Sequence, residues 1–142
     1  MKILLVEDDI MLNEMIAEYI TSTGHIIKSV KTGTESLQIL EKEKFDLLIL
    51  DINLPDIDGF TILEKMHEQK RMIPTIYISA LIDIEEISRA FDLGCFDYLK
   101  KPFHLKELTL RINKILKTRI VPQRHKRLSK HYSFDSENMT LL

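Results

Sequence analysis

Acidic side chains follow two apolar runs of this sequence. Glu7, Asp8 and Asp9 come directly after KILLV, and Asp51 comes directly after FDLLIL. Clustered carboxylates repel one another unless protons or a cation compensate them, and oxygen ligands of this kind suit Mg²⁺. A carboxylate beside Mg²⁺ can attack a phosphorus atom and become an aspartyl phosphate, because the metal neutralises charge on the transferring oxygens. Asp51 is the predicted nucleophile, since it closes the most apolar of the runs.

Two further polar residues stand at the ends of other apolar runs. Ser79 closes PTIYIS, and Lys101 follows FDYLK. The Lys101 ammonium could hold a phosphoryl oxygen, and the Ser79 hydroxyl could donate a hydrogen bond to it. Each of these acidic or polar residues, taken singly, is more simply explained as a helix cap, a turn former or a solvated charge. Their agreement at four run ends favours a site for phosphoryl transfer.

These residues can meet only if the runs that precede them lie side by side. Five apolar runs of strand length alternate with segments whose apolar residues recur at helical spacing. The runs are 2–6, 26–30, 45–50, 74–79 and 96–100. This alternation predicts an α/β fold: a doubly wound, five-stranded parallel sheet covered on both faces by five helices, with right-handed crossovers. Ligands of such sheets bind beyond the carboxyl ends of the strands, so the polar residues are expected at one edge.

Capping signals mark where the helices begin and end. Asp9 is expected to cap the first helix, and Thr32 with Glu35 forms a capping box that opens the second. Gly24 and Gly94 follow helical patterns at positions where a helix commonly ends. The last helix is expected to follow Pro102 and to end near residue 117.

The composition fits a single compact domain with a short appendage. The chain has 142 residues, of which 44% are hydrophobic and 30% charged, and its formal net charge is -2. This balance indicates no general attraction to nucleic acid or to a membrane. Residues 1–116 nevertheless carry 14 basic and 20 acidic side chains, whereas residues 117–131 carry six basic side chains and no acid. The body is therefore acidic and the C-terminal arm is basic.

The cysteine content and the N-terminus indicate a cytoplasmic protein. Cys95 is the sole cysteine, which excludes an internal disulfide and fits a reducing compartment. Between a redox thiol and a small packing residue, the second is favoured, because Leu93 and Phe96 make its setting apolar. The first apolar run meets three acids after four residues, which is too short for a signal peptide or a membrane span.

Four motifs, in their order and spacing, resemble the receiver domain of bacterial two-component response regulators. They are LLVEDD, LLILDINLPDIDGF, YISA and GCFDYLKKPF. The resemblance covers residues 1–118 and implies a flavodoxin-like receiver fold. It also implies that Asp51 is the phosphoacceptor. Mg²⁺ would be bound directly by Asp8, Asp51 and the backbone carbonyl of Asn53, with Glu7 acting through a metal-bound water.

The resemblance further implies a switch driven by charge. Ser79 and Lys101 would contact the phosphoryl group, Tyr98 would be the switch aromatic, and the peptide bond between Lys101 and Pro102 would be cis. A phosphoryl group on Asp51 would draw the Ser79 hydroxyl toward it, and Tyr98 could then fill the space left behind. The simpler alternative for Tyr98 is a half-buried aromatic residue of the strand.

The resemblance also implies that the fourth helix, the fifth strand and the fifth helix form the dimer face, as they usually do in regulators with a winged-helix output domain. Such regulators carry paired acids where this chain has Phe96 and Asp97, with basic partners on the flanking helices. Asp97 is expected to pair with Arg111 across a two-fold axis. Phe96 and Ile87 depart from the pattern, so the contact is expected to be more apolar than usual.

The C-terminal arm suggests a second domain. Residues 119–131 are expected to form a basic linker, and residues 132–142 resemble the opening strand of a winged-helix DNA-binding domain. The chain would then be part of a transcription factor that binds DNA only through a C-terminal domain missing from this sequence. The alternative is a solvated, disordered tail.

The predicted function is that of a phosphorylation-activated response regulator receiver domain with a transcriptional output. Its partners would be a sensor histidine kinase and, after phosphorylation, a second copy of the chain, with Mg²⁺ as cofactor and no membrane partner. It would promote only its own phosphorylation and dephosphorylation, and so would not be an enzyme for external substrates. One alternative is a stand-alone receiver that acts by docking to a protein. The other is a small Mg²⁺-dependent phosphohydrolase, in which Asn53 would stand where a second acid is expected.

Overall fold

The structure, a computed structural model, describes residues 1–80 and 83–120. The chain divides into two compact units, Met1–Arg111 and Ile112–Leu142. Every strand that the structure describes belongs to the first unit. Of the second unit, the structure describes the end of the last helix, α5 (Leu105–Ile120).

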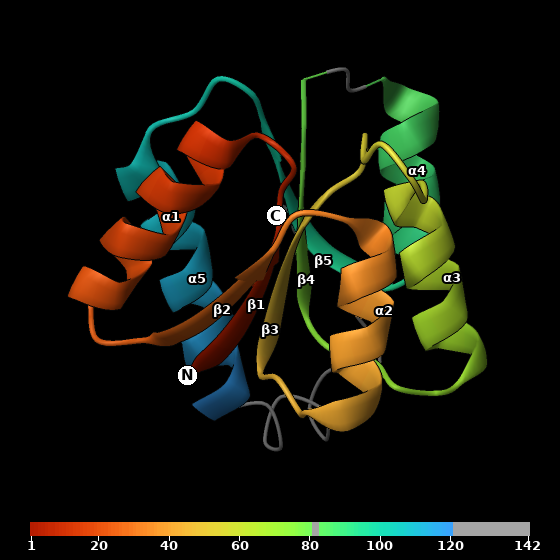
Figure 1. Ribbon diagram of the computed structural model, residues 1–142, viewed down its shortest axis with the longest axis horizontal. Coiled ribbons are helices and arrows are strands. Elements are labelled where there is room, and N and C mark those ends of the chain that lie inside the picture. The colour runs from red at the N-terminus through yellow and green to blue at the C-terminus, as the bar shows by residue number, and fades with distance from the viewer. Residues whose placement is uncertain (81–82, 121–142) are drawn as a thin grey trace. The chain divides into compact units, whose positions relative to one another are not determined.

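Five strands form one parallel sheet in the order β2-β1-β3-β4-β5 (Figure 1). They are β1 (Lys2–Val6), β2 (Ile26–Val30), β3 (Leu47–Asp51), β4 (Thr75–Ser79) and β5 (Cys95–Lys100). Every residue of β3 and β4 is buried, which is typical of a parallel sheet that is covered on both faces. The doubly wound α/β fold predicted from the alternating pattern is confirmed.

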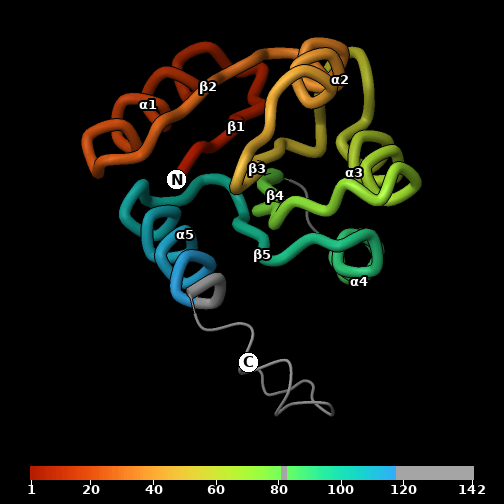
Figure 2. Tube along the Cα trace, turned by 90° about the horizontal axis from the view of Figure 1, so that it is seen from below, coloured from red at the N-terminus to blue at the C-terminus, as the bar shows by residue number. Residues whose placement is uncertain are grey.

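Helices cover both faces of the sheet. They are α1 (Ile10–Ser22), α2 (Gly33–Lys42), α3 (Gly59–Glu68), α4 (Ile84–Asp92) and α5. In Figure 2, α1 and the first turns of α5 lie on one face, and α2, α3 and α4 lie on the other. No helix within residues 1–80 and 83–120 is long and apolar enough to cross a membrane.

The expected capping signals operate in the structure. The Asp9 side chain accepts a hydrogen bond from the Leu12 backbone amide at the start of α1. Thr32 accepts one from the Glu35 amide at the start of α2. Gly24 and Gly94 both have a φ of 97°, the left-handed conformation in which glycine follows a helix without steric strain.

Two element boundaries and one helix face differ from what the sequence predicts. Strand β3 begins at Leu47 and includes Asp51, because the backbone of Asp51 still pairs with Ile78 of β4. On α1, Met11 and Met15 recur at helical spacing with the buried Ile16 and Ile20, which would predict burial, but they are 73% and 47% exposed. Helix α5 continues to Ile120, so the first two residues of the expected linker are helical. The rest of that linker and the expected output-domain strand lie outside the described residues.

Candidate functional site

The three acids of the sequence-predicted site converge at the carboxyl ends of β1 and β3. Glu7 and Asp8 follow β1, and Asp51 is the last residue of β3. Each offers a carboxylate oxygen, and these oxygens all lie within 4.8 Å of one another. Glu7 is fully buried and Asp51 is 3% exposed, whereas Asp8 is exposed to solvent. The cluster therefore opens to solvent at Asp8.

Lys101 supplies the positive charge at this cluster. Its Nζ lies 2.8 Å from Glu7 Oε1 and 3.0 Å from Asp51 Oδ2. Burial alone would lower the pKa of Lys101, but its hydrogen bonds to Glu7 and Asp51 outweigh burial and raise that pKa. Lys101 is therefore a fixed cation between two buried acids.

One lysine does not compensate three carboxylates. Burial raises the pKa of Glu7 to about 7, against the opposing effect of its hydrogen bond with Lys101, and the charge of Asp51 adds to the rise. An uncompensated cluster of hard oxygen donors fits a divalent cation such as Mg²⁺. The residues present therefore fit the metal that the sequence predicted.

Asn53 ties the β3–α3 loop to this cluster at two points. Its backbone amide donates to Asp51 Oδ1 at 3.0 Å, and its side-chain Nδ2 donates to Ser79 Oγ at 3.0 Å. Ser79 is fully buried at the end of β4. The structure thus brings Glu7, Asp51, Ser79 and Lys101 together with Asn53, at the expected edge of the sheet.

Asn13 holds the backbone of the first acidic loop, and the sequence analysis did not identify it. Its Nδ2 donates to the Glu7 carbonyl at 2.9 Å and to the Val30 carbonyl at 3.2 Å. Asn13 shares the buried face of α1 with Ile16 and Ile20. A polar residue at an inward position of a helical pattern was the signal that could have found it.

Tyr98 lies on β5, directly beside Tyr77 of β4 in the sheet register. It is half-buried, and its ring packs edge-to-face on Phe91 of α4, with ring centroids 6.2 Å apart. The peptide bond between Lys101 and Pro102 is cis, as the resemblance implied. Tyr98 is thus in contact with α4 rather than with the acidic cluster.

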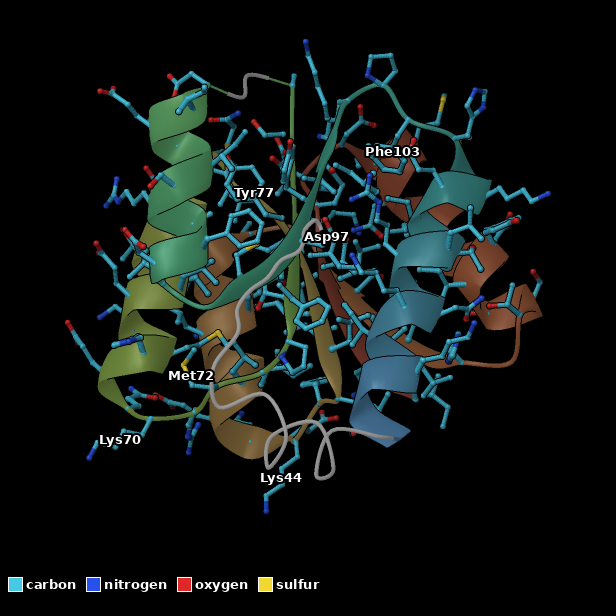
Figure 3. All side chains as sticks on the ribbon, turned by 180° about the vertical axis from the view of Figure 1, so that it is seen from behind. Lys44, Lys70, Met72, Tyr77, Asp97 and Phe103 are labelled. Carbon is cyan, nitrogen blue, oxygen red and sulfur yellow. The ribbon has the colours of Figure 1, made fainter. Side chains whose placement is uncertain are left out.

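Asp97 and Arg111 are paired within one chain. Arg111 Nη1 lies 2.5 Å from Asp97 Oδ1, and Asp97 is only 6% exposed. Figure 3 shows Asp97 on β5 near α5, the helix that carries Arg111. Arg111 also donates to the Tyr98 carbonyl and contacts Glu107. The expected pairing across a two-fold axis stays a prediction, and in the single chain the two residues form an ion pair with each other.

An apolar cavity of about 430 Å³ adjoins Lys101. Its lining residues come from the start of α1 and from the loops after β4 and β5: Asp9, Met11, Leu12, Met15, Ala80, Lys101, Pro102 and Phe103. Figure 3 labels Phe103, which lies between β5 and α5. The exposed methionines of α1 therefore border the same edge of the sheet as the acidic cluster.

Cys95 lies away from this edge, at the start of β5. Burial raises the pKa of its thiol to about 12, and its Sγ donates to the Asp97 carbonyl. A buried thiol held in its protonated form is a packing residue, as the sequence favoured.

Comparison with known families gives one match that covers most of the chain. A family described as "Response regulator receiver domain" matches residues 3–113. The chain is 32% identical over 145 residues to the transcriptional regulatory protein RprY of Bacteroides fragilis, with 99% of this chain and 61% of that protein covered. It is 36% identical over 116 residues to the transcriptional regulatory protein CiaR of Streptococcus pneumoniae, with 82% of this chain and 51% of that protein covered.

Solved structures agree with this match. The receiver domain of HemR from Leptospira biflexa, in its non-phosphorylated form, has a TM-score of 0.76 and 34% identity, covering 80% of this chain and 92% of that one. The signal receiver domain of a putative Luxo repressor protein from Vibrio parahaemolyticus has a TM-score of 0.81 and 27% identity, covering 86% and 94%. The chain spans about half to three-fifths of the length of the curated relatives named above.

Proposed function

Because the chain belongs to the response regulator receiver domain family, we propose that it is a phosphorylation-controlled switch whose phosphoacceptor is Asp51. One observation carries the proposal: the Asp51 carboxylate closes the central strand beside Lys101 and within a cluster of three acids. The central strand is a rigid mount, and the neighbouring cation is placed to meet an incoming phosphoryl group.

The residues of the site have different roles in the proposed phosphoryl transfer. Asp8, Asp51 and the backbone carbonyl of Asn53 would hold Mg²⁺ directly, and Glu7 would act through a water. When bound, the metal would neutralise charge on the transferring oxygens. An Asp51 carboxylate oxygen forms the new bond to phosphorus while the bond from phosphorus to the donor nitrogen or oxygen breaks, and the donor leaves with the bonding electrons. Lys101 then exchanges its contact with Asp51 for a phosphoryl oxygen.

Phosphorylation changes the hydrogen bonding at Ser79. The new dianionic group is a strong acceptor, so the Ser79 hydroxyl turns to donate to it and its contact with Asn53 Nδ2 weakens. The space behind Ser79 opens, and Tyr98 leaves Phe91 to enter it. The faces of α4 and β5 are thereby repacked.

A sensor histidine kinase is the proposed donor of the phosphoryl group. The apolar cavity beside Lys101, bordered by Met11, Met15 and Phe103, offers a docking surface next to the phosphoacceptor. Exposed methionines are adaptable contact residues, because their side chains are flexible and polarizable. A cytoplasmic location follows from this partner.

A second copy of the chain is the proposed partner after phosphorylation. Ile84, Phe91 and Leu110 expose apolar side chains on α4 and on the first turns of α5. Asp97 on β5 and Arg111 on α5 could exchange partners with a second copy. Because the relatives are transcriptional regulatory proteins, we propose that the dimer serves DNA binding by an output domain joined through residues 119–131.

The test of the phosphoacceptor is labelling by a small phosphodonor. Acetyl phosphate with Mg²⁺ should label the wild-type chain with a base-labile phosphoryl group, and Asp51→Asn should abolish that label while leaving the fold intact by circular dichroism. Labelling that persists in Asp51→Asn would overturn the assignment. Asp46→Asn, an acid just before β3, is the matched control and should label normally.

A further inference from the structure

We propose that Asp56 is a positioning residue that fastens the β3–α3 loop to the N-terminus of α2 and so fixes the Asn53 carbonyl for metal binding. The inference rests on the proposed function, since it concerns the same Mg²⁺ site. Asp56 is exposed and is neither a member of the acidic cluster nor a residue of any helix or strand. Any role of Asp56 at the metal site therefore has to come from the hydrogen bonds that its carboxylate accepts.

The Asp56 carboxylate accepts three hydrogen bonds from the first residues of α2. Oδ1 accepts from the Gly33 amide at 2.9 Å, and Oδ2 accepts from the Thr34 amide at 2.9 Å and from Thr34 Oγ1 at 2.6 Å. A carboxylate at a helix N-terminus meets unpaired amides and the positive end of the helix dipole. The hydrogen bonds from Thr34, followed by that from Gly33, hold the pKa of Asp56 well below its usual range. The carboxylate therefore stays ionised and keeps all three bonds.

The hydrogen bonds at the two ends of the β3–α3 loop do not hold its middle residues in place. The Gly59 amide donates to the Ile52 carbonyl and closes the base of the loop, and Asp58 caps α3 through the Phe60 amide. Between these points, the Asn53 amide donates back to Asp51 Oδ1 of the preceding strand. The other hydrogen bonds that the structure describes attach the loop to further elements in two places, Asn53 Nδ2 to Ser79 and Asp56 to α2.

The first of these attachments is the one that phosphorylation is proposed to weaken. Once the Ser79 hydroxyl turns to the phosphoryl group, the contacts of Asp56 become the main tie between the middle of the loop and the rest of the domain. The Asn53 carbonyl would then be held in place from the far side of the loop.

Packing reinforces the tie at the neighbouring residue. A Cβ at Gly33 would lie 2.9 Å from Ile57 Cβ and 3.2 Å from the Ile57 carbonyl oxygen, so the start of α2 and the loop are already in close contact. The hydrogen bonds of Asp56 and the contact of Ile57 therefore act on the same short segment. A displaced α2 N-terminus would move the loop with it.

Mg²⁺ binding depends on the exact position of the Asn53 carbonyl. The ion requires near-octahedral geometry at about 2.0–2.1 Å, so a ligand on a loose loop loses affinity. Residues that orient metal ligands without touching the metal typically contribute a factor on the order of ten or more to affinity. We expect Asp56→Ala to weaken Mg²⁺ binding on the order of tenfold. The phosphorylation rate at saturating Mg²⁺ should change little, because Asp51 and Lys101 stay in place.

The experiment measures Mg²⁺ binding by NMR titration of the unphosphorylated chain, together with hydrogen exchange of the Gly33 and Thr34 amides in the absence of metal. Asp56→Ala should weaken binding and speed both exchange rates. Asp56→Asn keeps one oxygen acceptor and should lie between Asp56→Ala and wild type. Thr34→Val removes only the hydroxyl bond and should have the smallest effect.

Thr32→Ala is the matched control. It removes the N-cap of α2, whose Thr32 Oγ1 accepts from the Glu35 amide, without touching the loop. If Thr32→Ala weakens Mg²⁺ binding as much as Asp56→Ala does, Asp56 acts only through helix stability and the inference is overturned. Unchanged Mg²⁺ affinity in both Asp56→Ala and Asp56→Asn would overturn it as well.

These readouts separate the inference from the proposed function. Persistent labelling of Asp51→Asn would remove the phosphoacceptor but leave the effect of Asp56 on Mg²⁺ affinity standing. Normal loss of labelling in Asp51→Asn, with no effect of Asp56 on the metal, would remove only the role of Asp56.

Discussion

The Lys101 ammonium lies 2.8 Å from the fully buried Glu7 carboxylate, so the resting site carries a cation of its own. That cation competes with a divalent ion for the same acids. The same side chain also contacts Asp51, the proposed phosphoacceptor, at 3.0 Å. If Asp51 accepts the phosphoryl group as proposed, Lys101 has to change partners, and the chemistry would be coupled to the conformation of the β5–α5 loop.

Lys101→Ala should separate metal binding from switching. Without the competing ammonium, Mg²⁺ affinity should stay at least equal to that of wild type. The metal-free chain should lose about 1–3 kcal/mol of stability, because a buried acid loses its partner. Beryllofluoride should no longer shift the NMR signals of α4 and β5. Lys100→Ala, the exposed neighbour, is the control, and loss of Mg²⁺ binding in Lys101→Ala alone would contradict the assignment.

The raised pKa of Glu7 predicts that the stability of the metal-free chain depends on pH. Its pKa is raised from 4.5 to about 7 in the folded chain, so the folded state retains a proton that the unfolded state releases. The resulting stabilisation is fully present below pH 4.5 and is lost as the pH rises through about 7. Its size is on the order of 3 kcal/mol. Urea denaturation of the metal-free chain should therefore give a lower free energy of unfolding at pH 8 than at pH 5.

Two comparisons test this origin of the pH dependence. Glu7→Gln cannot titrate and should flatten the trend between pH 5 and pH 8. Mg²⁺ requires the ionised acid, so its affinity should rise over the same range in the wild-type chain. An equally steep stability trend in Glu7→Gln would assign it to another group.

The convergence of the proposed site residues could be predicted from the sequence, for a general reason. Carboxyl ends of parallel strands share one edge, so residues that close separate apolar runs meet whatever the detailed packing. Asp51, Ser79 and Lys101 follow this rule in the structure. The edges of elements were less predictable: Asp51 lies inside the β3 ladder because β4 extends far enough to pair with it.

Contacts that depend on side-chain direction could not be predicted from spacing. The three bonds of Asp56 to α2 join residues 22 and 23 positions apart, and no local pattern links them. The pairing of Asp97 with Arg111 inside one chain depends on how α5 packs beside β5. The exposure of Met11 and Met15 shows the same limit, because helical spacing defines a face but not what covers it.

Gly94 has a close side-chain neighbour that a matched glycine lacks. A Cβ at Gly94 would lie 2.2 Å from Met72 Cε, whereas nothing lies within 4 Å of a Cβ at Gly24, and both residues have a φ of 97°. Gly24→Ala should therefore cost only the conformational penalty of about 1 kcal/mol. Gly94→Ala should cost about the same, because Met72 Cε is the end of a flexible side chain that is 51% exposed and can turn aside. Thermal and urea unfolding measure the stability of both variants. A third variant, Met72→Ala, removes the side chain that is labelled in Figure 3.

The third variant isolates the contact. The effect of Gly94→Ala should be the same in a Met72→Ala background as in the wild-type chain, because Met72 yields without cost. A larger loss of stability in Gly94→Ala than in Gly24→Ala, recovered by Met72→Ala, would show that Met72 cannot turn aside.

The packing of Tyr98 on Phe91 predicts how the resting conformation is held. The rings meet edge-to-face with centroids 6.2 Å apart, an arrangement that stabilises a pair by about 0.5–1.5 kcal/mol beyond the burial of its area. Phe91→Ala removes this contact from the resting conformation only, if Tyr98 leaves α4 on activation. The equilibrium should then shift toward the activated conformation by roughly threefold to tenfold. Two measurements check this shift. The rate of labelling by acetyl phosphate should rise, and the NMR signals of the Tyr98 ring should move toward their positions in the beryllofluoride-bound chain. In a Tyr98→Ala background Phe91→Ala should have no effect on the labelling rate, and an equal acceleration there would show that Phe91 acts through another part of α4.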